Sequence, residues 1–258
     1  PSVGKGFPVA RSITSPRRRE HAGRGFREVA SPMPSHTRGL TLDLDAALKG
    51  IVMFGWLEAE GLSGEPLGEA FAAERDASIR ELMRRSMGRS AADLPGVAET
   101  RGMFHRLGVD PTKTRPSSEA LLRRVLQGKG LPTIHPAVDV CNLASLEYQL
   151  PIGLYDRAHV RGAVYARMGR VLEGYEGIRK SFVGLSGRPL LADDDGAFGA
   201  PTSDSARTQV TEATRDLFAV VYAPVGRYGD PLSEMLARVA DLLARHCGAT
   251  VRLVQTRQ

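Results

Sequence analysis

The sequence predicts an α+β fold for residues 41–258 as a single domain. Helical patterns are grouped between residues 65 and 148, and short apolar runs bounded by Gly and Asp dominate the chain after residue 148. The regular alternation of strand and helix that a parallel βαβ fold requires is absent. The chain has 258 residues and is 42% apolar, so it is long enough to bury a substantial core.

The first predicted elements are a strand and an amphipathic helix. Residues 50–59 contain the continuously apolar run IVMFGWL, which has the length of a buried strand. Residues 65–87 predict a helix because apolar side chains, among them Leu67 and Phe71, recur at helical intervals. A shorter helix is expected over residues 97–107.

Residues 110–142 carry four prolines, two glycines and eight formal charges between apolar segments. Two of the prolines exclude a regular helix in the first part of this stretch. Ser117 or Ser118 then provides an N-cap, and Glu119 stands favourably near the positive end of the helix. Two glycines end that helix, and a proline-framed link leads to a second helix over residues 137–148.

The second half of the chain is predicted to form mainly short strands and turns. We expect strands at residues 162–169, 188–198 and 215–224, a helix over 230–248 and a last strand over 249–255. The acidic turn Asp193, Asp194, Asp195 and Gly196 could ligate a cation, but contiguous acids before Gly more often form a hairpin turn. We therefore expect no metal site. Cofactor motifs such as a Walker loop or a dinucleotide fingerprint are absent from the sequence, so no cofactor is expected.

The net positive charge of the chain is carried by its first 40 residues. They hold eight of the 35 Lys and Arg residues and two of the 29 Asp and Glu residues, so residues 41–258 are neutral overall. This segment is rich in Pro, Gly and Ser and lacks apolar periodicity, which predicts a disordered tail. It is interpreted as a nucleic-acid-binding arm, a targeting peptide, or an upstream extension outside the working protein.

The remaining composition points to a cytoplasmic protein. No run approaches the roughly 20 apolar residues that a membrane helix needs, so no membrane partner is expected. The two cysteines, Cys141 and Cys247, lack the spacing of a disulfide framework or a zinc site.

Polar residues in the stretch 110–142 are the first functional candidates, each with a structural alternative. Asp139 and Asn142 are three residues apart on one helix, so they share a face and either bind a ligand or link adjacent turns. His135 is a candidate acid or base, although an isolated His more often packs or hydrogen-bonds. Four basic residues either contact an RNA backbone or merely solvate a helix surface: Lys113, Arg115, Arg123 and Arg124.

A family resemblance rests on several blocks that occur in one order. They are PTKTRPSSEALLRRVLQGKGLPTIHPAVDVCNLASLEYQLPIGLYD, then Gly162, then TQVTEATRDLF. These blocks resemble free-standing relatives of the tRNA-binding and editing module of the bacterial phenylalanyl-tRNA synthetase β chain, over about residues 103–223. The resemblance implies a mixed or antiparallel sheet with packed helices and a substrate pocket between them.

The resemblance further implies hydrolysis of an amino acid ester wrongly formed on tRNA. Such a reaction needs an oriented water, donors for the developing oxyanion, and a pocket that reads the amino-acid side chain. This sequence departs from the family pattern, because Gly153 stands where the synthetase module has a histidine, and Ser205 or Ala206 where it has an acid. The usual asparagine of the link is His135.

Two classes of function therefore stay open. The first is an aminoacyl-tRNA deacylase acting in trans, and the second is a non-catalytic module that binds tRNA or an amino acid; a structural relic is a third. The resemblance places the pocket where the Asp139 and Asn142 helix meets the turn at 150–156 and the segment 202–214. The catalytic candidates are Asp204, Thr208 and His135, and the substrate-binding candidates are Asp139, Asn142, Gly153 and Ser205.

Overall fold

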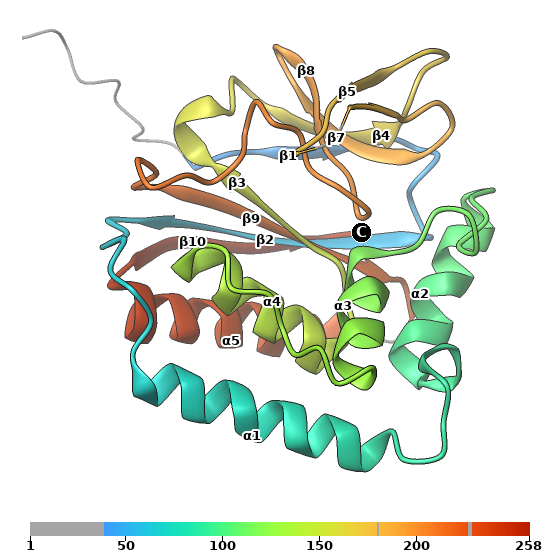
Figure 1. The fold of residues 1–258 in the computed structure, drawn as a ribbon. Helices are drawn as coiled ribbons and strands as arrows, with labels where there is room; N and C mark the ends of the chain where they lie inside the picture. Colours follow the sequence, from blue (N-terminus) through green and yellow to red (C-terminus); the bar gives the residue numbers. More distant parts are fainter. Residues whose placement is uncertain (1–38, 180, 227–228) are drawn as a thin grey trace, which may run out of the picture. The chain divides into compact units, whose positions relative to one another are not determined.

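Three layers build the unit Arg38–Gln258 in the computed structural model, two sheets and a layer of helices (Figure 1). The structure describes residues 39–179, 181–226 and 229–258. All but the last two residues of the predicted tail, 1–40, lie outside the described residues. The fold class is α+β, which confirms the prediction from the sequence.

The middle layer is a four-stranded antiparallel sheet in the order β10-β2-β9-β3. Its strands are β2 (Val52–Glu60), β3 (Ile152–Asp156), β9 (Leu217–Pro224) and β10 (Thr250–Arg257). Strands β2 and β9 are central and almost entirely buried on both faces, which explains the continuous apolar run predicted as a buried strand.

The outer layer is a second sheet in the order β1-β4-β7-β8. Its strands are β1 (Leu42–Leu44), β4 (Val164–Met168), β7 (Pro189–Asp193) and β8 (Gly196–Gly199). Strand β1 runs parallel to β4 and the other pairs are antiparallel, so this sheet is mixed. A small hairpin of β5 (Gly174–Glu176) and β6 (Phe182–Gly184) extends from it.

A layer of helices covers the free face of the middle sheet, except that the helix over residues 95–106 packs its Met103 and Phe104 in the core half between the two sheets (Figure 1). The helices are α1 (Glu69–Arg85), α2 (Pro95–Arg106), α3 (Ser117–Leu126), α4 (Pro136–Tyr148) and α5 (Gly229–Cys247), with short 3-10 turns η1 (Ala91–Asp93) and η2 (Arg157–His159). Among the described residues, none of these helices has the length and apolarity that crossing a bilayer requires.

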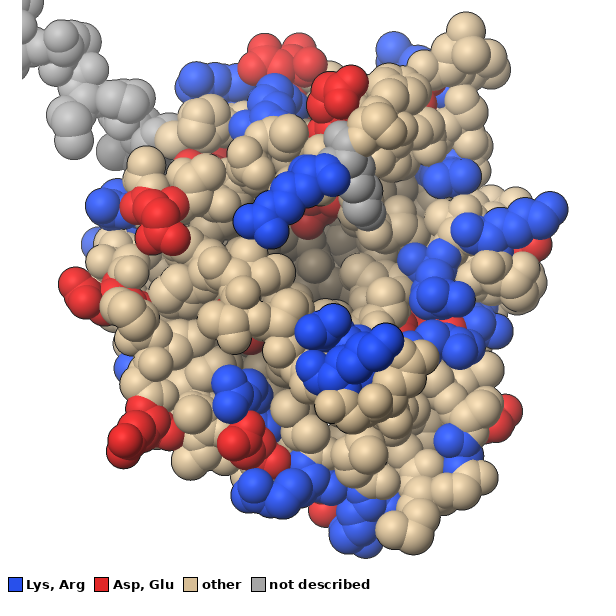
Figure 2. Space-filling view, in the orientation of Figure 1, with Lys and Arg blue, Asp and Glu red and all other residues tan. Residues whose placement is uncertain are grey.

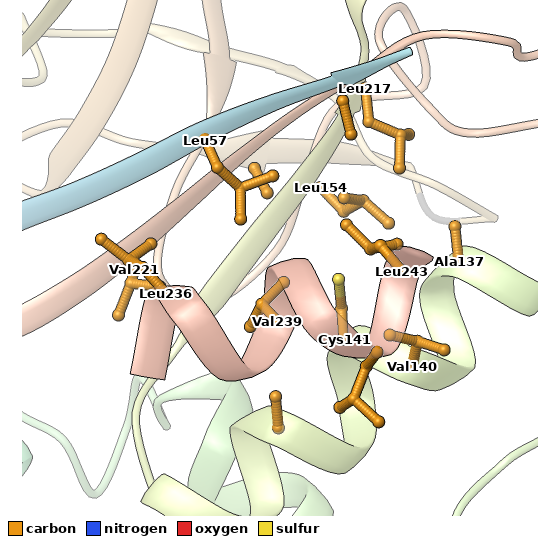
Figure 3. Close-up of a cluster of buried hydrophobic side chains, with 14 of the residues drawn as sticks. Leu57, Ala137, Val140, Cys141, Leu154, Leu217, Val221, Leu236, Val239 and Leu243 are labelled. Carbon is orange, nitrogen blue, oxygen red and sulfur yellow. The ribbon is translucent and has the colours of Figure 1, made fainter. Parts of the chain in front are cut away.

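The alternation of side chains along β2 and β9 divides the core into two halves. Odd-numbered residues such as Leu57 and Val221 pack against α4 and α5, where they meet Val140 and Leu243 (Figure 3). Even-numbered residues, for example Phe218, face the outer sheet. The middle sheet is therefore fixed from both sides and gives β3, its edge strand, a rigid support.

Three details differ from the sequence-based expectations. Helix α3 begins at Ser117 with Pro116 as its N-cap, because the Ser117 amide is bound by the Pro201 carbonyl at 3.0 Å and needs no side-chain cap. The segment expected to be a turn, residues 150–156, contains strand β3, which pairs with β9 from Ile152 onward. The helix predicted over residues 65–87 begins only at Glu69, after Gly64, Pro66 and Gly68.

Candidate functional site

A pocket of about 320 Å³ lies where α3, α4 and β3 meet two loops, and we call it the α4 pocket. Figure 2 shows the surface hollowed near the centre of this face. Its apolar lining residues are Leu121, Ile134, Val138, Ile152, Leu154, Ile178 and Val210. Its polar lining residues are Ser117, Asn142, Ser145, Arg179, Asp204 and Gln209, and Cys141 also lines it. Mostly apolar walls with a few polar groups are typical of small-molecule sites.

The loop that carries Asp204 is held on three sides. The Asp204 carbonyl accepts a hydrogen bond from the Ile178 amide at 3.3 Å, at the turn between β5 and β6. The Thr208 carbonyl accepts one from Asp156 at the end of β3, at 2.9 Å. At its start, the Pro201 carbonyl binds the first amide of α3. The backbone of this loop is thus fixed relative to both helices and sheet.

Two buried tyrosines hold the Asp204 side chain at the pocket. The Tyr155 hydroxyl donates to Asp204 Oδ1 at 2.9 Å and lies 3.2 Å from the Tyr222 hydroxyl. Burial and then the charge of Asp204 raise the pKa of Tyr155 well above its usual range, so the phenol stays neutral and can donate. The hydrogen bond therefore orients the Asp204 side chain.

Gly153 makes room for that tyrosine. Residues two apart on a strand face the same side, and the Tyr155 ring lies over the position where a Gly153 side chain would stand. A Cβ on Gly153 would come within 2.0 Å of the Tyr155 hydroxyl oxygen, and one on Gly199 of β8 within 2.1 Å. The space beside Gly153 is thus occupied by Tyr155 rather than open to a ligand.

Ser205 and Thr208 lie beneath the surface of the same loop. Both are almost completely buried, and their hydroxyl oxygens are 3.1 Å apart. Neither lines the α4 pocket. Their visible contribution is to fix the loop that presents Asp204 and Gln209.

His135 and Asp139 lie in a second pocket of about 300 Å³ beside the start of α1, which we call the α1 pocket. The Ala137 amide donates to His135 Nδ1 at 3.3 Å, so His135 caps α4, and the Ile134 amide donates to Asp139 Oδ1 at 2.9 Å. Burial lowers the pKa of His135 and raises the pKa of Asp139. The helix therefore directs Asp139 to one pocket and Asn142 to the other.

The predicted basic residues fall into different surroundings. Arg115 and Arg123 approach the carboxylate of Glu119, which is buried, and Arg101 of α2 joins them there. Arg124 donates instead to the Gly130 carbonyl at 3.0 Å, and Lys113 is exposed. Sequence patterns did not indicate Arg101, which binds Glu119, or Tyr155, which binds Asp204, because each partner is distant in the sequence.

Other candidate sites do not collect these residues. A groove of about 830 Å³ between α1 and the start of α2 is lined by the ion-paired Glu81 and Arg85, and it contains none of the predicted site residues. In the acidic turn, Asp193 pairs with Arg207 at 2.8 Å. Within the described ranges, no cluster of three or more His, Cys, Asp and Glu is arranged to hold a metal ion.

Residues 99–226 match the family model of the B3/4 domain. This part of the chain is a B3/4 domain. The match confirms the resemblance predicted from residues 103–223. The B3/4 domain runs from α2 to just beyond β9 and contains every residue that lines the α4 pocket, whereas part of the α1 pocket lies outside it.

Two known proteins are similar to this chain. The phenylalanine–tRNA ligase beta subunit of Streptomyces avermitilis is 31% identical over 138 residues, which cover 52% of this chain and 15% of that protein. The solved N-terminal fragment of the phenylalanyl-tRNA synthetase beta-subunit from Pyrococcus horikoshii superposes with a TM-score of 0.45 and 16% identity, covering 86% of this chain and 55% of the fragment. The chain thus corresponds to a small part of the ligase subunit.

Proposed function

We propose that the B3/4 domain binds aminoacyl-tRNA and hydrolyses its aminoacyl ester in the α4 pocket. The family relationship to a phenylalanine–tRNA ligase subunit supports the tRNA-related role. The observation that carries the ester chemistry is the carboxylate of Asp204, which Tyr155 holds at the edge of an otherwise mostly apolar pocket. A pocket of about 320 Å³ has room for an amino-acid side chain and the reacting ester.

The walls of the α4 pocket have different roles in the proposed reaction. The apolar residues of α3, α4 and β3 receive the amino-acid side chain, since burying it excludes water and reads its size. Asn142 and Gln209, whose amides carry N–H donors, face the ester carbonyl, where negative charge develops. Asp204 orients the attacking water. The ribose hydroxyl of the substrate is a second group in the site that can transfer a proton.

Several predicted residues act less directly in this proposal. Thr208 and Ser205 position the loop from below, and His135 belongs to the α1 pocket and caps α4. Gly153 lets Tyr155 reach Asp204. They are positioning residues, and their substitution is expected to act through Asp204 or through the fold.

A non-catalytic role is the second candidate, and one observation favours it. Asp204 is the only carboxylate among the described residues that line the α4 pocket, and His135 is not there to serve as a base. A domain of this kind would hold tRNA or a free amino acid without turnover. The two candidates share a ligand and differ in whether the ester bond is broken.

Deacylation separates them. The chain is incubated with a panel of tRNAs, each charged with a cognate or a wrong amino acid, and the loss of the labelled amino acid is followed over the spontaneous rate. The proposal predicts accelerated hydrolysis of at least one member of the panel. Saturable binding of an aminoacyl-tRNA with hydrolysis at the spontaneous rate throughout would establish the non-catalytic role instead.

A further inference from the structure

One buried carboxylate gathers three arginines beside the α4 pocket. Glu119 of α3 is only 1% exposed, and Arg101 of α2 donates from Nε and Nη2 to its two oxygens, both at 2.8 Å. Arg123, one turn along α3, donates from Nε to Glu119 Oε1 at 2.8 Å. Arg115, in the loop before α3, has its Nε 3.7 Å from the same oxygen.

The cluster holds more positive charge than the buried carboxylate needs. A two-pronged arginine is enough to compensate one carboxylate, and Arg101 already has that geometry. Arg115 and Arg123 therefore add two positive charges, and their side chains are more exposed, at 46% and 36%, than that of Arg101 at 22%. Within the described part of the chain, the terminal nitrogens of Arg123 make no hydrogen bond. They remain available to an anion from solvent.

The cluster and the α4 pocket share helix α3. Ser117 and Leu121 of α3 line the pocket, and Glu119 and Arg123 stand on the opposite side of the same helix. Figure 2 shows Lys and Arg side chains gathered over α2 and α3, next to the hollow. The two places are separated by about the width of one helix, roughly 10–12 Å.

We infer that Arg101, Arg115 and Arg123, arranged by Glu119, form a clamp for a phosphodiester of the single-stranded RNA end whose terminal ester enters the α4 pocket. This inference rests on the proposed function for the choice of RNA. Guanidinium groups match phosphate oxygens with paired hydrogen bonds, and Glu119 arranges them before the RNA arrives. Measured along the axis of a B-form DNA duplex, each strand carries a phosphate about every 3.4 Å, so an ester in the pocket places the first few phosphates of its strand within reach of α3.

The test measures RNA affinity against salt concentration. The probe is an RNA stem with a four-nucleotide single-stranded 3′ tail to which no amino acid is attached. The comparison probe is the same stem with a blunt end. The full chain is compared with the double variant Arg115→Gln and Arg123→Gln, which leaves Arg101 on Glu119. The matched control is Arg84→Gln with Arg85→Gln on α1, which removes two arginines that also pair with one glutamate, Glu81.

For the tailed RNA, the magnitude of the slope of log affinity against log salt is expected to fall by about 0.7 in the clamp variant, the value for one single-strand phosphate contact. The single variant Arg115→Gln removes the guanidinium that lies farthest from Glu119. It is expected to show about half of that fall in slope. The slope for the control variant and the slopes for the blunt stem are expected to stay unchanged. All variants keep the basic first 40 residues, so their contribution cancels.

An unchanged slope in the clamp variants would overturn the inference, and so would an equal fall in the control variant, which would reveal a general charge effect. Equal losses with the blunt stem would overturn the assignment to a single-stranded end. Because the probe carries no amino acid, the result is independent of ester hydrolysis. A chain that deacylates tRNA but shows no change in slope lacks only the clamp, and one that shows the change without deacylation lacks only the enzyme activity.

Discussion

Asp204→Asn is expected to lower the turnover of an aminoacyl ester, or the affinity for its ligand, at least about tenfold, which corresponds to ~1.4 kcal/mol. Asn keeps the size of the side chain and an oxygen that accepts from Tyr155, but it removes the negative charge at the pocket. The fold should therefore persist. The measurement is the single-turnover rate of deacylation together with the thermal unfolding midpoint.

The matched control is Asp195→Asn, which removes an exposed carboxylate from the turn between β7 and β8, away from the α4 pocket. Thr208→Val removes the hydroxyl that meets Ser205 and is expected to reduce turnover similarly by loosening the loop, whereas Thr208→Ser should restore it. Unchanged binding and unchanged turnover in both the Asp204 and the Thr208→Val variants would remove this loop from the site.

Gly153→Ala is expected to damage both the fold and the activity. The added methyl carbon would lie 2.0 Å from the Tyr155 hydroxyl and 2.6 Å from its Cζ. The ring has no space to retreat, because it is fully buried against Phe198, with ring centroids 4.8 Å apart, and against Phe218. We expect the free energy of unfolding to fall by about 1–3 kcal/mol, as for an overpacked core. The displaced hydroxyl would also release Asp204, so turnover should fall even under conditions where the variant is folded.

Gly184→Ala in β6 is the control for this prediction, since no atom lies within 4 Å of its added Cβ. Urea unfolding of the two variants gives the comparison, and deacylation is then measured without urea at a temperature well below both thermal midpoints. Similar stabilities for the two alanine variants would mean that Tyr155 does not depend on the space at Gly153. Full activity in a folded Gly153→Ala protein would mean that Tyr155 does not hold Asp204 for the reaction.

The helices can be predicted from the sequence because their signals are local. The prolines and glycines around α3 and α4 stand within a few residues of the helix ends, and the helices begin and end where those residues require. The sequence predicts a turn in place of strand β3 because these five residues have little periodicity of their own. They form a strand because β9 is available to pair with them, which is a tertiary effect.

The site can be predicted only in part, for a related reason. The family resemblance brings the Asp204 loop and α4 together correctly, and both line one pocket. It places Asp139 and Asn142 together as well, but the two residues are far enough apart around α4 to face different pockets. Tyr155 and Asp204 are 49 positions apart in the sequence, and Arg101 and Glu119 are 18 positions apart. No local sequence pattern predicts these contacts.

A crystal structure with a stable substrate analogue would show whether the α4 pocket receives the aminoacyl group. The analogues are 3′-aminoacylamino-3′-deoxyadenosines, in which an amide replaces the ester, with aromatic and aliphatic amino acids compared. We expect the amino-acid side chain between Leu121, Ile134 and Ile152, with the ribose next to Asp204. An analogue bound in the α1 pocket against His135, or an α4 pocket left empty by an analogue that saturates the protein in solution, would contradict it.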